Sequence, residues 1–263
     1  GSTYLGWDDK LHVKVAVKEY YPNFLVSRTA DGRSVRPHSE DSADQFYFGM
    51  EKFLDEARLL AQFRDVREII NVVDFFEEND TAYIVMEYVA GRPLNTVLKE
   101  RGGRLPLTEV IGLVLPIIIA LEKLHERNII HRDISPDNIY LADDGRVKLL
   151  DFGAARQALG DKTQSMTVVL KRGYAPAEQY SSTSRQGPWT DVYALCATIY
   201  RAITGQPPPE AVSRWEEDPL VPPSRMGVAI PASVEAALLK GMTLRWQERL
   251  QNMAELRDAM RGR

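Results

Sequence analysis

The sequence contains a single cysteine, Cys196, among its 263 residues. One cysteine excludes both an internal disulfide framework and a cysteine-rich zinc site. We therefore expect the reducing cytosol to be the compartment of this domain. Cys196 lies in an apolar stretch, and a buried core thiol is the simplest interpretation of it.

Long hydrophobic runs and a marked excess of charge are also missing. The longest apolar run, residues 110–121, contains Pro116 and is shorter than the roughly 20 residues that span a bilayer, so we expect a buried helix there. The formal net charge of −4 argues against a nucleic-acid-binding domain, which is usually basic. No secretory signal is recognisable, and we expect membrane contact, including any anchor of a longer protein, only through regions outside this chain.

What is present is a change of hydrophobic periodicity near residue 90. Before it, alternation predicts strands at residues 11–20, 25–28, 34–36, 72–76 and 82–88, with a polar loop at 37–44 and a helix at 48–63. After it, helical spacing predicts helices at 108–127, 192–204, 233–242 and 253–261, and two short strands at 138–141 and 147–150. The pattern indicates an α+β chain with a strand-rich part, 1–90, and a helix-rich part, 91–263, joined by a hinge at 87–92.

Four short clusters carry candidate chemistry. Lys18 ends an apolar strand, Glu56 lies in the first helix, HRDISPDN occupies 131–138, and DFG occupies 151–153. Each alone has a plainer interpretation, such as a solvated lysine, a solvated helix charge or a chance tripeptide. Their order, followed by GYAPAE at 173–178, is typical of protein kinases.

Through VAVKEYYP, YIVMEYVAGRPL, HRDISPDNI and GYAPAEQY, the chain resembles bacterial Hanks-type serine/threonine protein kinases over nearly its whole length. The resemblance implies a bilobal protein-kinase-like fold, with a small β-rich N-lobe carrying one key helix and a larger helical C-lobe. It also implies transfer of the γ-phosphate of ATP to protein hydroxyls with Mg²⁺, and autophosphorylation of the activation segment.

The resemblance also implies roles for individual residues. Lys18 would contact the α- and β-phosphates and pair with Glu56, and Asp133 would accept the proton of the substrate hydroxyl. Asn138 and Asp151 would hold magnesium, which takes hard oxygen ligands. Adenine would lie between the lobes, bounded by residues of both: Ala16, Met86, Glu87, Val89 and Tyr140.

Further residues of the resemblance are structural or regulatory. Asp191 would support the catalytic loop, and Glu178 would pair with Arg249 beneath the activation segment. His131 and Phe152 are expected to pack rather than to catalyse. Arg132 would bind a phosphate on the activation segment. The candidate acceptors of that phosphate are Thr163, Ser165 and Thr167, with Thr167 slightly favoured.

Three departures from the family pattern matter. Residues 1–6 resemble only the end of a glycine-rich loop, or a non-native start joined to the strand that follows, so the fragment is expected to bind ATP poorly unless upstream residues exist. Ser135 stands where serine/threonine kinases usually have a lysine, and Lys171 stands where they usually have a threonine. We hypothesise a swap, in which the cation lost at 135 returns at 171. The alternative is that Lys171 is a solvated lysine beside Arg172.

Two other functions stay open on the sequence alone. A catalytically impaired kinase-like scaffold is suggested by the missing glycine loop and by Ser135, although all five chemical residues are present. A small-molecule phosphotransferase of the aminoglycoside-kinase type shares an aspartate–asparagine loop, but the long segment from 151 to 178 indicates a peptide platform. The protein substrates are not specified by the sequence, and self-association for autophosphorylation in trans is left open.

Overall fold

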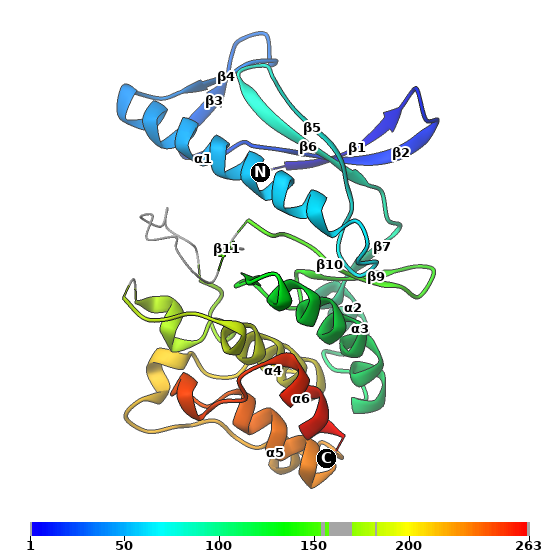
Figure 1. The fold of residues 1–263 in the computed structure, drawn as a ribbon, viewed down its shortest axis with the longest axis vertical. Coiled ribbons are helices and arrows are strands. Elements are labelled where there is room, and N and C mark those ends of the chain that lie inside the picture. Colours follow the sequence, from blue (N-terminus) through cyan, green and yellow to red (C-terminus); the bar gives the residue numbers. More distant parts are fainter. Residues whose placement is uncertain (1, 154–155, 158–169, 182, 262–263) are drawn as a thin grey trace. The chain divides into compact units, whose positions relative to one another are not determined.

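The computed structural model describes residues 2–153, 156–157, 170–181 and 183–261. The chain divides into two units, Gly1–Ala90 and Gly91–Arg263, at the boundary that the change of periodicity indicates. Figure 1 shows the strands and the single long helix of the first unit, and the helices of the second. In the part of the chain that the structure describes, no helix has the length and apolar character needed to cross a membrane.

The first unit is built on a four-stranded antiparallel sheet in the order β1-β2-β6-β5. Its strands are β1 (Ser2–Asp8), β2 (Val13–Glu19), β5 (Val72–Glu78) and β6 (Thr81–Glu87). Residues 2–6, expected as the end of a glycine-rich loop, therefore belong to a regular strand. A separate hairpin of β3 (Val26–Arg28) and β4 (Val35–Pro37) occurs where two short strands were predicted.

Helix α1 (Glu40–Leu60) packs on β5 and β6 and is followed by η1 (Ala61–Phe63). It begins eight residues before the predicted helix, so the expected polar loop at 37–44 is wrong. The Ser39 side chain accepts a hydrogen bond from the Ser42 amide and thus caps the helix. Acidic Glu40 and Asp41 in the first turn interact favourably with the helix dipole.

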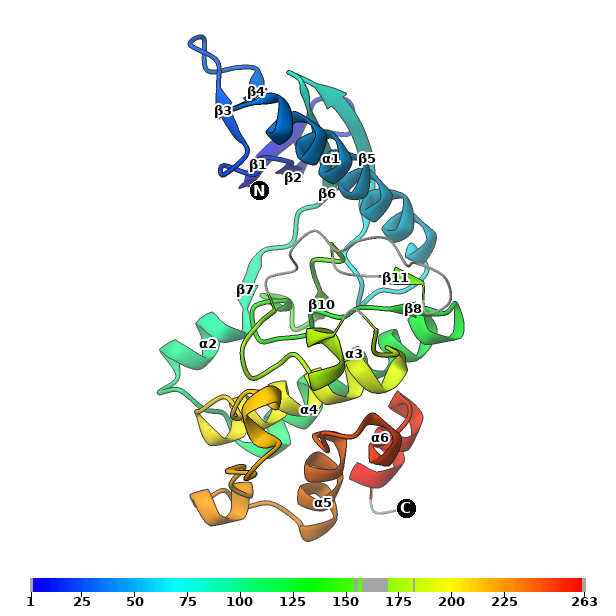
Figure 2. The same ribbon diagram turned by 90° about the vertical axis from the view of Figure 1, so that its left-hand side faces the viewer.

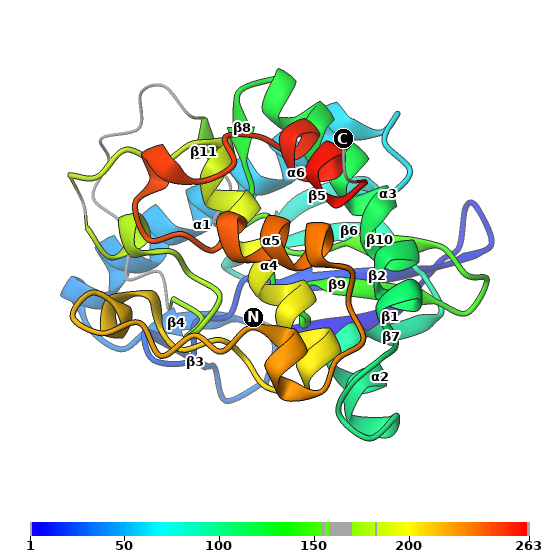
Figure 3. The ribbon, with the colours of Figure 1, turned by 90° about the horizontal axis from the view of Figure 1, so that it is seen from below.

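The second unit is organised around α4 (Pro188–Thr204), of which almost every residue is buried. It contacts α3 (Leu107–Glu126), α5 (Ala232–Gly241) and α6 (Met253–Met260), as Figure 3 shows from below. Cys196 of α4 is buried and free, as predicted. Pro116 lies inside α3, which continues through it.

Short elements of the second unit carry the polar motifs. A three-stranded sheet joins β7 (Gly91–Pro93), β9 (Ile139–Ala142) and β10 (Val147–Leu149), and α2 (Leu94–Glu100) follows β7. Strand β8 (Ile129–Ile130) precedes the HRDISPDN motif, and β11 (Arg156–Gln157) follows the DFG motif. The two strands pair with each other. The 3-10 turns are η2 (Ala177–Tyr180), η3 (Ala211–Arg214), η4 (Pro223–Met226) and η5 (Trp246–Glu248).

Candidate active site

Lys18 and Glu56 form an ion pair within the first unit. The Nζ atom of Lys18, on β2, lies 3.0 Å and 3.3 Å from the two carboxylate oxygens of Glu56, on α1. The side chains are 22% and 6% exposed, so the pair is largely shielded from water. Removing one member of such a pair typically costs about 3–5 kcal/mol, because the other charge stays buried. The sequence therefore places a lysine and its counter-charge where the resemblance requires them.

The other first-unit residues predicted to contact adenine lie on β2, on β6 and just after β6. Ala16 and Met86 are opposite one another in the β2–β6 register. The amide of Glu87 donates to the Asn71 carbonyl at 2.9 Å, so an adenine contact from Glu87 would have to use its carbonyl. Val89 is half-buried just after β6 ends. In the second unit, Tyr140 lies half-buried on β9.

His131, the first residue of the catalytic loop, has a structural role. Its Nε2 atom lies 3.2 Å from the Leu150 carbonyl, and its Nδ1 accepts from the Asp133 amide at 3.3 Å. Burial lowers the pKa of His131, which keeps the ring neutral, as these two contacts require. The ring also packs edge-on against Phe152 at 4.5 Å between centroids. Both residues therefore pack, as expected from the sequence.

Asn138 holds the carboxylate of Asp133. Its Nδ2 donates to the Asp133 backbone carbonyl at 2.7 Å and to Asp133 Oδ2 at 2.8 Å. With the amide nitrogen used in this way, Oδ1 is the Asn138 atom that could ligate a cation. Burial raises the pKa of Asp133, and the nearby Lys171 charge opposes this rise.

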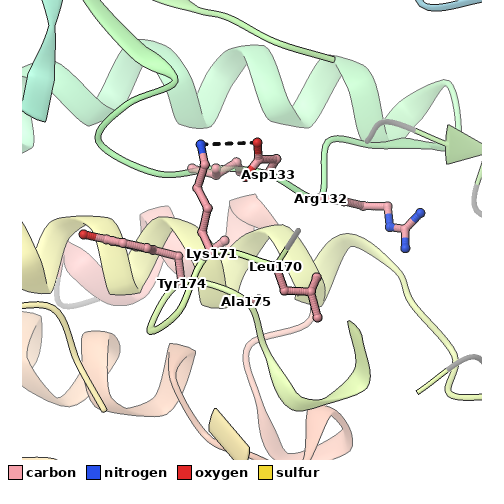
Figure 4. A pocket seen from close by; sticks show the side chains of 8 residues that line it. Arg132, Asp133, Leu170, Lys171, Tyr174 and Ala175 are labelled. Carbon is pink, nitrogen blue, oxygen red and sulfur yellow. Dashed lines mark ion pairs between the residues drawn. The ribbon is translucent and has the colours of Figure 1, made fainter. Parts of the chain in front are cut away.

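Lys171 reaches this carboxylate from the end of the activation segment. Its Nζ donates to Ser135 Oγ at 2.9 Å and lies 3.3 Å from Asp133 Oδ2, whereas the Arg132 side chain points away from it (Figure 4). The Lys171 carbonyl accepts from the amides of Tyr174 and Ala175, which fixes the turn that carries it. The amine is thus directed at the catalytic loop, which is the geometry that the hypothesised swap requires.

Gly173 shapes the turn after Lys171. Its φ of +82° lies in the left-handed region, and a Cβ there would come within 2.7 Å of the Pro208 carbonyl. Any other residue would therefore strain the backbone and displace the segment. This glycine keeps the turn beneath Lys171 close to the Pro207–Pro209 stretch of the same unit.

Asp191, at the start of α4, supports the catalytic loop from below. One oxygen accepts from the Arg132 amide at 2.8 Å, and the other accepts from the His131 amide at 2.9 Å and contacts His125 Nε2 at 2.8 Å. Arg132 has a φ of +71°, a strained conformation for a non-glycine residue, which these bonds hold in place. Burial would raise the pKa of Asp191, but these hydrogen bonds and the His125 contact outweigh it, and the pKa is lowered.

Asp151 provides the second oxygen donor suited to magnesium. Its residue is exposed, its φ is +58°, and its Oδ1 accepts from the Gly153 amide at 3.2 Å. The Leu150 amide donates to the Asn138 carbonyl at 2.8 Å, which ties the DFG motif to the catalytic loop. One carboxylate and one amide oxygen fit Mg²⁺, which completes its octahedron with phosphates and water.

Glu178 and Arg249 form a fully buried, two-pronged ion pair. Arg249 Nη1 and Nη2 lie 2.7 Å and 3.2 Å from the two oxygens of Glu178, and Thr190 adds a hydrogen bond. The adjacent Gln179 donates to the Arg132 carbonyl at 2.8 Å, and sequence reasoning missed this link. The sequence feature that could have indicated this link is the glutamine that follows the glutamate in GYAPAEQY. His125, the partner of Asp191, was missed too, because no sequence motif marks it.

The three predicted phosphate acceptors are not tested by this geometry. Thr163, Ser165 and Thr167 lie outside the described residues. Arg132, their expected partner, is half-buried in the catalytic loop.

Comparisons with known proteins agree with this geometry. A profile described as the protein kinase domain matches residues 33–220. A probable serine/threonine-protein kinase of Clostridium acetobutylicum is 30% identical over 86% of this chain and 35% of its own length. The serine/threonine-protein kinase PknL of Mycobacterium tuberculosis is 32% identical over 70% of this chain and 46% of its own. The chain thus spans less than half the length of these curated relatives.

A solved structure described as the apo form of PpkA-294 is similar over 98% of this chain and 90% of its own, with a TM-score of 0.87 and 34% identity. The expected α+β bilobal fold is thereby confirmed. The motif order, the paired charges and these similarities lead to one conclusion: the chain belongs to the protein kinase domain family.

Proposed function

We propose that this chain is a serine/threonine protein kinase domain that transfers the γ-phosphate of ATP to protein hydroxyls. The observation that carries the proposal is the Asp133 carboxylate, which Asn138 and Lys171 hold at 2.8 Å and 3.3 Å while its side chain stays 25% exposed. A fixed yet accessible carboxylate suits a base that receives a substrate proton. The relatives named as serine/threonine-protein kinases support the choice of acceptor.

In the proposed reaction, the serine or threonine oxygen attacks the γ-phosphorus while the bond to the ADP oxygen breaks. The hydroxyl proton passes to Asp133, and ADP leaves. Because such transition states are loose, catalysis depends mainly on positioning and charge neutralisation. Lys18, fixed by Glu56, would contact the α- and β-phosphates.

Asn138 and Asp151 would hold Mg²⁺ together with the ATP phosphates. The metal would neutralise developing charge on the phosphate oxygens. The chain's own contribution is to present Asn138 Oδ1 by committing Nδ2 to Asp133. The strained backbone at Asp151 would present its carboxylate at the start of the activation segment.

Lys171 would supply the cation that the catalytic loop lacks at Ser135. The amine lies beside the proposed base, and its side chain is 29% exposed, so an incoming phosphate could reach it. Ser135 is buried and accepts the amine's hydrogen bond, which aims the lysine at the loop. The presence of this positive charge at the catalytic loop would thereby depend on the folding of the end of the activation segment, which carries Lys171.

Phosphorylation of the chain by a second copy of itself is part of the proposal. Thr163, Ser165 and Thr167 are the proposed acceptors, and Arg132 would bind the resulting phosphate. Mass spectrometry after incubation with ATP and Mg²⁺ tests this step: phosphate between residues 160 and 170 is expected. An unmodified segment in an otherwise active kinase would contradict it.

The kinase proposal is tested by transfer of labelled γ-phosphate to a general protein acceptor. Asp133→Asn should lower the rate by about 10²–10⁴-fold, because a positioned base is lost. Asp144→Asn is the matched control, because it makes the same change at an exposed turn, where Asp144 pairs with the neighbouring Arg146. A wild-type chain that binds ATP and Mg²⁺ yet transfers nothing would favour the impaired scaffold instead.

A further inference from the structure

The hairpin β3–β4 lies in the chain between the two members of the Lys18–Glu56 pair. Strand β2, which carries Lys18, ends at Glu19, and the hairpin spans Val26–Pro37. Only His38 separates the end of β4 from Ser39, the cap of α1. The position of the hairpin therefore determines where the helix that carries Glu56 begins. Figure 2 shows β3 and β4 beside the start of α1.

A buried apolar cluster joins this hairpin to the first half of α1. We call it the hairpin cluster. Its buried members come from the hairpin, from the residue just before the hairpin and from α1, and partly buried side chains pack against them. These residues are Leu25, Val26, Val35 and Phe46, with Tyr20, Tyr21 and Met50 around them. Its buried area makes the helix and the hairpin one packed body rather than two independent elements.

Aromatic contacts extend from the cluster to the ion pair. The ring of Tyr20, two residues after Lys18, lies 5.3 Å from that of Phe46 and 5.4 Å from that of Phe53. The Lys18 amine lies 5.6 Å from the centroid of Phe53. Phe53 precedes Glu56 by three residues, which places both on one face of the helix.

Polar contacts fix the hairpin to the sheet that carries Lys18. The Val35 amide donates to the Asn79 carbonyl at 3.0 Å. Arg28 donates to the carboxylate of Glu19 at 2.5 Å, and Glu19 is only 1% exposed. Tyr83 of β6 donates to the other oxygen of Glu19 at 3.2 Å. The hairpin is therefore attached both to the strand of the lysine and to the helix of the glutamate.

We infer that the β3–β4 hairpin is a positioning element that holds Glu56 against Lys18. About ten residues of continuous helix, roughly 15 Å, connect Phe46 of the cluster to Glu56, and a helix transmits its orientation over that length. Fixing its first half to the sheet thus fixes the carboxylate. The catalytic consequence rests on the proposed function, whereas the positioning itself does not.

The first test compares two valines that are each 1% exposed, Val35 in the hairpin and Val110 in α3 of the other unit. Val35→Ala should raise hydrogen exchange in residues 51–60 and lower kcat/KM for ATP about tenfold, as misplacement of catalytic groups does. Val110→Ala removes the same two methyl groups and should change neither. Arg28→Gln, which loosens the hairpin through its polar contact, is the second variant should Val35→Ala fail to fold.

The second test is a double-mutant cycle with Glu56→Gln. If the hairpin acts through the ion pair, Val35→Ala should cost less than about twofold in kcat/KM once Glu56 has been neutralised. A full tenfold cost in that background would overturn the inference, as would unchanged exchange at 51–60 in both hairpin variants. An inactive wild-type chain would instead refute the proposed function, and the exchange experiment would still decide the positioning role.

Discussion

The Lys171 amine contacts both Ser135 Oγ, at 2.9 Å, and Asp133 Oδ2, at 3.3 Å. A residue of the activation segment thus supplies positive charge at the catalytic loop, beside a serine that carries none. The contact joins two motifs that lie 36 residues apart within one unit.

Removal of this amine should slow phosphoryl transfer. Lys171→Ala is expected to lower kcat about 10²-fold, the usual cost of losing one group that stabilises transition-state charge. The double variant Ser135→Lys/Lys171→Ala should recover much of this loss, because a lysine at position 135 would place a positive charge at the same point of the site. Arg172→Ala is the control, since its side chain is 88% exposed and pairs with Glu210, away from Asp133. Steady-state kinetics would contradict the swap if Lys171→Ala matched the wild type.

The acid side of the pH profile should report on Asp133. Burial raises the pKa of this carboxylate, so activity should fall on acidification at a higher pH than for an ordinary aspartate. The Lys171 charge favours the ionised form, and its removal in Lys171→Met should raise that pKa further. The acid limb of kcat/KM against pH should therefore move to higher pH in the variant. A shift to lower pH would contradict this electrostatic account.

Asp191→Asn should destabilise the second unit and the catalytic loop together. The buried carboxylate accepts from the amides of His131 and Arg132 and contacts His125. Loss of this charge should cost about 3 kcal/mol in the free energy of unfolding, measured by urea titration. Asp144→Asn, at an exposed turn, should cost much less.

The same residue predicts a pH dependence of stability. The folded-state pKa of Asp191 is lowered, so its contribution to stability is present at neutral pH and is lost as the pH falls through that lowered pKa. Asp191→Asn should therefore show a weaker decline of stability with acid than the wild type. An equal decline in both proteins would show that other carboxylates dominate.

Cys196 should be inert in the native protein. Burial raises the pKa of its thiol to about 12, and a thiol in that state has almost no reactive thiolate at neutral pH. A thiol reagent should label the unfolded chain within minutes and the folded chain only at the rate of unfolding. Rapid stoichiometric labelling of the folded chain would contradict the buried position.

The sequence predicted the elements that have strong periodicity and missed those that depend on distant partners. Alternating valines at 13, 15 and 17 placed β2, and apolar spacing placed the second half of α1. The first half of α1 was assigned to a loop because residues 40–45 are mostly polar. Phe46 is the large buried residue of that half, and it packs with Leu25, Val26 and Val35 of the hairpin and its approach.

The candidate site was predictable mainly through the order of its motifs. Lys171 was inferred from a missing and a gained lysine, and its contact with Ser135 agrees with that hypothesis. Gln179 and His125 support the catalytic loop through single long-range hydrogen bonds, which no local sequence pattern predicts. The burial of Glu19 depends likewise on Arg28 and Tyr83, which only the fold brings together.

The most direct test of the central claim is the transfer of labelled γ-phosphate from ATP and Mg²⁺ to serine or threonine of a protein acceptor. It requires the wild-type chain, Asp133→Asn and the control Asp144→Asn, with any upstream residues of the native protein restored. The account predicts label on serine or threonine with the wild type and the control, and a loss of at least about 10²-fold with Asp133→Asn. Equal transfer by Asp133→Asn and the wild type would contradict it.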